Sequence, residues 1–178
     1  TTFLRTIQQR STKRMIVVAP TGVAAINANG VTIHSFFQLP LSPFVPESTV
    51  KPRFEYSKQK RQIMRTLDLL IIDEISMVRA DILDAIDSIL RRFREHNKPF
   101  GGVQLLMIGD LQQLTPIVRP DEEKLLSRYY NTPYFFDSKA LQSTQYVTIE
   151  LTRVFRQQDK VFIDILNHFR DGNVSDED

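Results

Sequence analysis

The sequence contains no cysteine, and only six of its 178 residues are glycine. Without cysteine there can be no disulfide bridge and no thiolate metal site, and the composition fits a reducing interior. No apolar run approaches the ~20 residues that a membrane-spanning helix needs. A net charge of +2 makes the chain only mildly basic. These features are typical of one soluble domain that is large enough for a real core.

The sequence also lacks a G-x-x-x-x-G-K-[ST] loop. In many nucleotide-binding proteins the backbone amides and the lysine of that loop cradle the phosphates. We therefore expect weak nucleotide binding at best, and no ATP hydrolysis, from these 178 residues alone.

The most informative feature that is present is a pair of carboxylates, Asp73 and Glu74, directly after the apolar run 69–72. Such a short run, rich in β-branched residues, predicts a buried parallel strand. Its end then lies at the carboxyl edge of an open sheet, where α/β proteins bind ligands. In phosphoryl transfer an Asp in this position holds Mg²⁺ on the nucleotide, and a second carboxylate can orient a water. The alternative is a strand that meets a helix cap.

A second apolar run, residues 103–108, ends at Gly109 and Asp110. We expect Gly109 to allow an unusual backbone angle and Pro116 to stiffen the end of the turn. The amide of Gln113 can both donate and accept, which suits sensing a water or a terminal phosphate. The alternative is an ordinary strand-to-loop turn.

A third predicted strand, residues 15–19, is followed by the small and hydroxyl residues of segment 20–27. Such residues leave backbone amides available for phosphates at a helix start. His34, Phe36 and Phe37 follow, and aromatic side chains near such a loop commonly hold single strands. The alternative is that both phenylalanines belong to the core and that His34 is simply hydrogen-bonded.

The last predicted strand covers residues 146–149, and Arg156 follows it. An Arg beyond a strand of the same sheet edge can reach a transferring phosphate. The alternative is a surface Arg in a linker.

Alternating strands and helices predict an α/β fold with a parallel sheet. The expected helices are residues 1–9, 23–29, 58–67, 80–95 and 160–170. Four prolines in segment 39–53 predict a surface excursion. Basic residues in and after it either meet DNA phosphates or form a solvated helix face; they are Lys51, Arg53, Lys58, Lys60, Arg61 and Arg65.

Four stretches together resemble the PIF (petite integration frequency) family of DNA helicases, in branch B of superfamily one. They are, in the family's order, APTGVAAINANGVTIHSFF, LLIIDEISM, GGVQLLMIGDLQQLTPIV and ELTRVFRQ. The resemblance covers nearly the whole chain. It implies a RecA-like P-loop NTPase layer fold, truncated at the N-terminus, with ATP and Mg²⁺ as cofactors.

The resemblance also implies roles for single residues. Asp73 corresponds to the Mg²⁺-holding acid, and Glu74 to the carboxylate that activates water. Gln113 corresponds to the phosphate-sensing glutamine, Arg156 to the arginine that reaches the terminal phosphate, and Asp110 to a further nucleotide contact.

Several other residues lie in segments that touch single-stranded DNA in relatives. They are Pro20, Thr21, Asn27, Thr32 and His34. Thr115 stands where many members have proline, and we expect little effect of this difference on the chemistry.

By the same resemblance the start of the chain looks like the helix that follows the phosphate loop, with Thr1 as a Mg²⁺-binding hydroxyl. We expect a piece of a longer protein, without the loop and without the strand that lies between the strands 103–108 and 146–149 in this class. Residues 1–170 would form the motor domain, with a wedge insertion at 38–60, and residues 171–178 would lead to a second motor domain.

The resemblance further implies an intracellular monomer, in a bacterial cytoplasm or a eukaryotic nucleus or mitochondrion. It would move five-prime to three-prime on single-stranded DNA, unwind forked or structured DNA, and serve DNA repair, recombination and telomere maintenance. Two alternatives stay open. One is a non-catalytic nucleic-acid-binding module, and the other is an unrelated metal hydrolase built on Asp73, Glu74 and Asp110.

Overall fold

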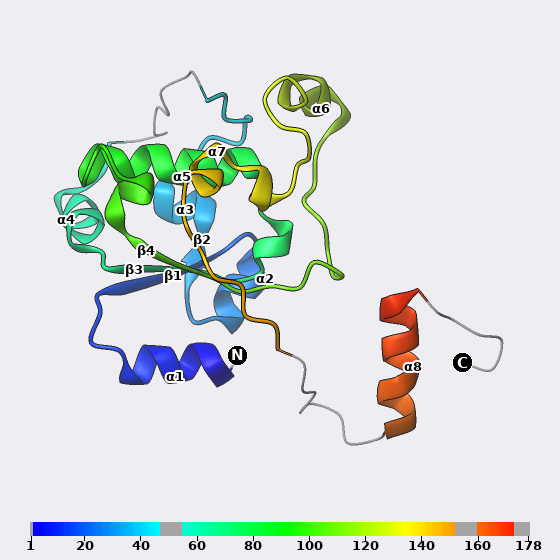
Figure 1. The fold of residues 1–178 in the computed structure, drawn as a ribbon. Helices are drawn as coiled ribbons and strands as arrows, with labels where there is room; N and C mark the ends of the chain where they lie inside the picture. The colour runs from blue at the N-terminus through cyan, green and yellow to red at the C-terminus, as the bar shows by residue number, and fades with distance from the viewer. Residues whose placement is uncertain (1, 47–54, 152–159, 173–178) are drawn as a thin grey trace. The chain divides into compact units, whose positions relative to one another are not determined.

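The computed structural model describes residues 2–46, 55–151 and 160–172. The chain divides into two compact units, residues 1–145 and 146–178. The first unit is built on a four-stranded sheet with the order β2-β1-β3-β4 (Figure 1). The strands are β1 (Met15–Ala19), β2 (Val31–Thr32), β3 (Leu69–Ile72) and β4 (Gln104–Met107). All three strand pairs are parallel, so the predicted α/β fold with a parallel sheet is confirmed.

Helices connect and cover these strands. The α-helices of the first unit are α1 (Thr2–Arg10), α2 (Gly22–Asn27), α3 (Ile33–Phe37), α4 (Lys58–Thr66), α5 (Ala80–Phe93), α6 (Pro120–Leu126) and α7 (Lys139–Gln142). Short 3₁₀ turns are η1 (Ile75–Met77), η2 (Pro99–Gly102) and η3 (Phe135–Asp137). The helices predicted at 1–9, 23–29, 58–67 and 80–95 are confirmed to within a few residues. The helix α3 was not predicted, because it is too short to show the repeated apolar spacing of a helix.

The alternation of side chains along the strands produces two cores. Leu70 and Ile72 face a large core shared with α3, α4 and α5. Leu69 and Ile71 face a smaller core that includes Leu4 of α1. Successive strand residues point to opposite faces of a sheet, so one four-residue strand supports both layers. Figure 1 shows α3, α4 and α5 on one side of the sheet and α1 and α2 on the other.

The position of a strand in the sheet decides how deeply it is buried. All four residues of β3 are buried, because β3 has a neighbour on each side. β4 is the edge strand of the described sheet, and its apolar residues Leu105, Leu106 and Met107 are only partly buried.

The second unit contains α8 (Lys160–Asp171), as predicted for residues 160–170. The strand predicted at 146–149 is wrong, since these residues are in no strand. Their apolar alternation satisfies the sequence pattern of a strand, but a strand also needs a hydrogen-bonded neighbour. Most of the linker predicted at 171–178 lies outside the described residues.

None of the helices in the described ranges is long and apolar enough to cross a lipid bilayer.

Candidate functional site

The carboxyl ends of three neighbouring strands bring the predicted site residues to one edge of the sheet. Because β1, β3 and β4 run parallel and side by side, their carboxyl ends face the same way. The residues that follow these ends are Pro20 and Thr21 after β1, Asp73 and Glu74 after β3, and Gly109 and Asp110 after β4. This is the edge at which open α/β sheets bind ligands.

The two carboxylates after β3 sit on a sharply turned backbone. The amide of Asp73 still donates to the carbonyl of Val18 at 2.9 Å, which continues the ladder with β1. Glu74 then adopts a left-handed conformation, with φ 53° and ψ 46°, and η1 begins directly after it. A non-glycine residue in this region is uncommon and costs free energy, and such residues cluster at functional sites.

Both carboxylates are partly exposed, and within the described residues no other side chain engages either of them. Two such groups suit Mg²⁺, which takes one or two protein carboxylates together with water and phosphate oxygens. The described residues contain no group of three or more His, Cys, Asp or Glu side chains that could hold a metal by itself. Asp73, Glu74 and Asp110 therefore do not form such a group of three.

The turn after β4 is organised around Asp110. One carboxylate oxygen accepts from the backbone amide of Gln112 at 3.0 Å, and the other accepts from the side-chain amide of Gln113 at 3.1 Å. The carbonyl of Asp110 also accepts from the backbone amide of Gln113 at 3.1 Å. Asp110 thus fixes the orientation of the Gln113 amide and leaves its oxygen as an acceptor.

Gly109 joins the two turns by close packing. A Cβ on Gly109 would lie 2.9 Å from Cγ2 of Ile75 and 3.0 Å from its backbone nitrogen. The same Ile75 amide donates to the carbonyl of Ile108 at 2.9 Å. The prediction of an unusual backbone angle at Gly109 is wrong, because its φ is not positive. The glycine is needed for space, because it packs directly against Ile75, the residue after Glu74. We call Asp73, Glu74, Asp110 and Gln113 the carboxylate edge.

Next along the sheet, three of the predicted DNA-contacting residues line one cavity of about 180 Å³. Pro20 and Thr21 come from the end of β1, and His34 comes from the first turn of α3. The other lining residues are Ile33, Leu41, Met77, Val78, Arg79, Ile82 and Ile117. We call this space the His34 cavity.

The surroundings of His34 disfavour its charged form. Burial lowers the pKa of His34, the charge of Arg79 lowers it further, and Asp81 partly opposes both. The imidazole is therefore mainly neutral at pH 7, where it can donate and accept hydrogen bonds.

The remaining predicted DNA residues are placed differently. The hydroxyl of Thr21 caps α2 by accepting from the amide of Ala24 at 3.2 Å, and that of Thr32 caps α3 by accepting from Ser35 at 3.3 Å. Asn27 lines another cavity, of about 550 Å³, that includes residues of α1. The structure therefore groups Pro20, Thr21 and His34 and leaves Asn27 apart from them.

Phe36 and Phe37 are core residues, as the alternative reading predicted. Both are buried, and their ring centroids lie 4.8 Å apart in an edge-to-face contact. Lys60 of α4 lies over the Phe36 ring and donates to the carbonyl of Ser35 at 2.9 Å. This basic residue therefore supports α3 from the side.

Four residues named from the sequence lie outside the described ranges. They are Thr1, Lys51, Arg53 and Arg156. Part of the predicted wedge, residues 47–54, lies outside them as well.

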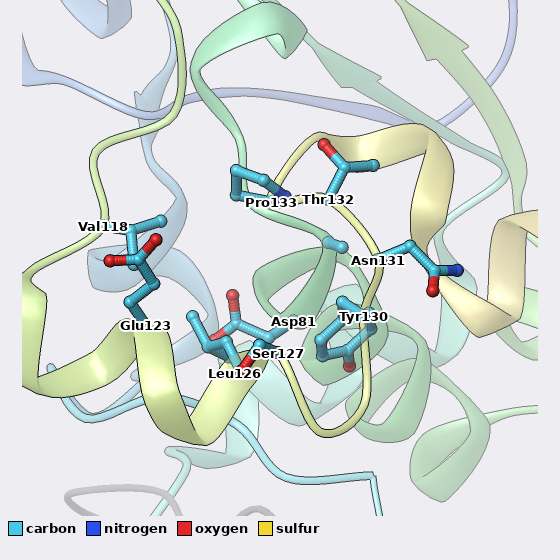
Figure 2. A pocket seen from close by; sticks show the side chains of 10 residues that line it. Asp81, Val118, Glu123, Leu126, Ser127, Tyr130, Asn131, Thr132 and Pro133 are labelled. Carbon is cyan, nitrogen blue, oxygen red and sulfur yellow. The ribbon is translucent and has the colours of Figure 1, made fainter.

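A further cavity, of about 150 Å³, lies between α6 and segment 130–133 (Figure 2). Its lining is largely apolar and includes Leu126, Tyr130 and Pro133. Asp81 belongs to this lining while its neighbour Arg79 belongs to the His34 cavity, so the two charged residues lie between the two spaces.

Sequence reasoning missed Leu41, Arg79 and Ile117 at the His34 cavity. Arg79 carried a usable signal, since it is a charged residue between the apolar end of the LLIIDEISM stretch and an amphipathic helix. Leu41 and Ile117 carried none, because isolated apolar residues in loops are common.

Comparisons with known proteins agree with this arrangement. The family model of the PIF1-like helicase matches residues 1–178. The ATP-dependent DNA helicase PIF1 of Saccharomyces cerevisiae is 38% identical over 166 residues, which are 93% of this chain and 18% of that protein. Human PIF1 is 39% identical over 168 residues, which are 91% of this chain and 24% of that protein. The chain thus spans about a fifth to a quarter of the length of these relatives.

Solved structures are similar over almost the whole chain. A Bacteroides Pif1 helicase in complex with ADP-AlF3 and single-stranded DNA superposes with a TM-score of 0.93 and 45% identity, covering 99% of this chain and 41% of that one. The Pif1 helicase of Candida albicans gives a TM-score of 0.79 and 36% identity, covering 99% of this chain and 38% of that one. The parallel sheet is accordingly that of a RecA-like fold. From the motifs, their placement at one sheet edge and these similarities, the chain belongs to the PIF1-like helicase family.

Proposed function

We propose that this chain is the front motor domain of an ATP-dependent DNA helicase, which couples ATP hydrolysis to five-prime to three-prime movement on single-stranded DNA and to duplex unwinding. One observation carries the proposal. The carboxylate edge and the His34 cavity follow neighbouring strands at one edge of the sheet. A similar Bacteroides protein is known in complex with both ADP-AlF3 and single-stranded DNA, which supports the assignment of the two sites.

On the nucleotide side, Asp73 would hold the Mg²⁺ of ATP, and Thr1 would contribute its hydroxyl. The bound ion neutralises the charge that develops on the phosphates. Glu74 has no partner among the described side chains, so its carboxylate is available to accept a proton from the attacking water.

Gln113 and Arg156 complete the proposed chemistry. With its amide N–H held by Asp110, Gln113 would accept a hydrogen bond from the water and so orient it. Arg156 would meet the charge of the terminal phosphate.

On the DNA side, we propose that Pro20, Thr21 and His34 contact the single strand, with Thr32 beside them. Asn27 would contact the strand at a separate place. A neutral His34 can hydrogen-bond to a base or a sugar without attracting the phosphate backbone to itself. Forked and structured DNA would be the physiological substrates. We propose a monomer in a bacterial cytoplasm or a eukaryotic nucleus or mitochondrion.

The test is the ATP turnover of the full-length protein with and without a single-stranded oligonucleotide. We expect DNA to stimulate turnover, and Arg156→Ala to lower it by about 10³–10⁵-fold with little change in nucleotide affinity. The proposal fails if turnover is independent of DNA. A loss of DNA binding in Arg156→Ala, with turnover intact, would instead assign Arg156 to a linker role.

A further inference from the structure

Arg79 forms the centre of a buried cluster of charges beside the His34 cavity. Its side chain is only 12% exposed. Nε donates to Oδ1 of Asp81 and NH2 donates to Oδ2 of Asp81, both at 2.8 Å. NH1 donates to Oε2 of Glu122, also at 2.8 Å. Burial alone would lower the pKa of Arg79, but the hydrogen bonds and charges of Asp81 and Glu122 outweigh it and raise the pKa.

This cluster, which we call the Arg79 clamp, joins segments that are distant in the sequence. Asp81 accepts from the backbone amide of Phe44 at 3.0 Å, in the proline-rich segment. Glu122 accepts from the backbone amide of Arg119 at 3.2 Å, at the start of α6. Arg79 itself comes a few residues after Glu74. The clamp therefore holds the proline-rich segment and the start of α6 against the stretch that follows the carboxylate edge.

Each tied segment contributes one apolar side chain to the His34 cavity. Leu41 lies three residues before Phe44 and is 78% exposed. Ile117 lies two residues before Arg119 and is 76% exposed. Neither packs in the core, so the positions of the two side chains depend on where their segments are held.

The ion pairs of the clamp are not expected to add much to the stability of the fold. Desolvation of two charges often cancels the attraction between them, and apolar residues of similar volume are frequently as stabilising. A bidentate Arg–carboxylate pair does, however, fix geometry strictly. The clamp is therefore suited to placing segments rather than to adding stability.

We propose that Arg79 is a positioning residue for single-strand binding, which acts through Asp81 and Glu122 to hold Leu41 and Ile117 as the apolar rim of the His34 cavity. The rim contacts the bases or sugars of the strand, while His34 offers a polar contact. The inference rests on the proposed function, since it assigns the strand to this cavity.

The test uses the full-length protein and measures the affinity for a labelled oligonucleotide by fluorescence anisotropy, together with ATP turnover. Glu122→Gln keeps the shape of the side chain but weakens the charge-assisted hydrogen bond to Arg79. We expect it to raise the half-saturating DNA concentration about tenfold, because charge-assisted bonds are roughly twice as strong as neutral ones. Turnover without DNA should stay at the wild-type rate, which a general loss of structure would not allow.

The rim variants Leu41→Ala and Ile117→Ala test the same surface without disturbing the core. Each should weaken binding about three- to tenfold, since each buried CH₂ is worth on the order of a factor of four. If the clamp acts by holding the rim, Ile117→Ala should cause little further loss in a Glu122→Gln background. Effects that multiply would overturn the inference.

Asp68→Asn is the matched control. It weakens another Arg–carboxylate pair, in which Nε of Arg14 donates to Asp68 at 2.8 Å, just before β3 and therefore at the opposite end of the sheet. DNA affinity should not change in this variant.

If Glu122→Gln does not fold, wild-type affinity in both rim variants overturns the inference by itself. If His34→Ala weakens binding but the clamp and rim variants do not, the inference fails while the proposed function stands. Absence of DNA binding in the wild-type protein overturns both.

Discussion

The carboxylate edge and the His34 cavity lie at the same edge of the sheet but are built in different ways. The carboxylate edge consists of two short turns, each directly after a buried strand, and a close contact between Gly109 and Ile75 joins them. The His34 cavity is assembled from the end of β1, the start of α3, the stretch from η1 into α5, and two loop residues, Leu41 and Ile117. Its wall includes Arg79, whose ion pair with Glu122 joins positions 43 residues apart.

Because the two sites are built differently, they are sensitive to different kinds of substitution. Residues at the ends of strands are placed by the sheet, so a change there affects mainly the chemistry of one side chain. Residues in loops are placed by their contacts, so a change at a distant partner can alter the cavity. Substitutions in the full-length protein can therefore separate the two sites.

Between the two sites, the largest effect is expected from Glu74→Gln. The amide cannot accept the proton of the attacking water, so turnover should fall by about 10²–10⁴-fold, the usual contribution of a general base. Affinity for single-stranded DNA should not change. Phosphate release and fluorescence anisotropy measure the two quantities, and Glu123→Gln, at an exposed position of α6, is the control. Turnover at the wild-type rate in Glu74→Gln would show that another group activates the water.

Gly109→Ala tests the contact between the two turns of the carboxylate edge. The added Cβ would lie 2.9 Å from a side-chain atom of Ile75 and 3.0 Å from its backbone nitrogen, so the turns must move apart. We expect a loss of about 1–3 kcal/mol in the free energy of unfolding, typical of overpacking, and a clear drop in turnover. Denaturant unfolding and phosphate release measure these effects.

Gly22→Ala is the matched control, because a Cβ at Gly22 would meet nothing within 4 Å. At the first residue of α2 this change should leave stability the same or raise it by up to about 1 kcal/mol. Equal stabilities of the two alanine variants would contradict the close-packing role of Gly109.

His34→Ala should affect the other site. We expect the affinity for single-stranded DNA to fall about tenfold, which corresponds to the binding free energy usually lost with one contact to a base. Turnover without DNA should be unchanged. Affinity should still fall steeply with salt, because phosphate contacts made elsewhere release counterions. Fluorescence anisotropy at several salt concentrations measures both, with His96→Ala at an exposed position as the control. Wild-type affinity in His34→Ala would remove the cavity from the DNA path.

The smallest expected effect is a pH dependence of stability. The folded protein holds the pKa of His34 below its ordinary value of 6.5, mainly through burial. The unfolded chain therefore binds a proton more readily, so this stability is present above pH 6.5 and is lost as the pH falls through the folded pKa. Urea midpoints at pH 7.5 and 5.5 should differ less in His34→Asn than in the wild type. An equal difference in both proteins would contradict a depressed pKa at His34.

Much of the fold could be predicted because local patterns agreed with it. The run 69–72 is uniformly apolar and forms a strand buried on both faces. The stripe of apolar residues between 80 and 95 forms the long amphipathic helix α5. Residues 146–149 have a strand-like pattern too, but a strand also depends on a partner, and the pattern contains no information about one.

The pattern of residues was enough to predict most of the strands and helices and the order of the motifs, because these depend on periodicity and on turn residues that are close together in the chain. The same patterns predicted that Asp73, Glu74 and Gln113 follow the ends of strands in one sheet. Three features became visible only in the folded chain: Gly109 serves close packing, Asn27 lies apart from His34, and Arg79 connects the proline-rich segment with α6. Such contacts join residues up to 43 positions apart, and one sequence does not record which of many polar residues will meet once the backbone has folded.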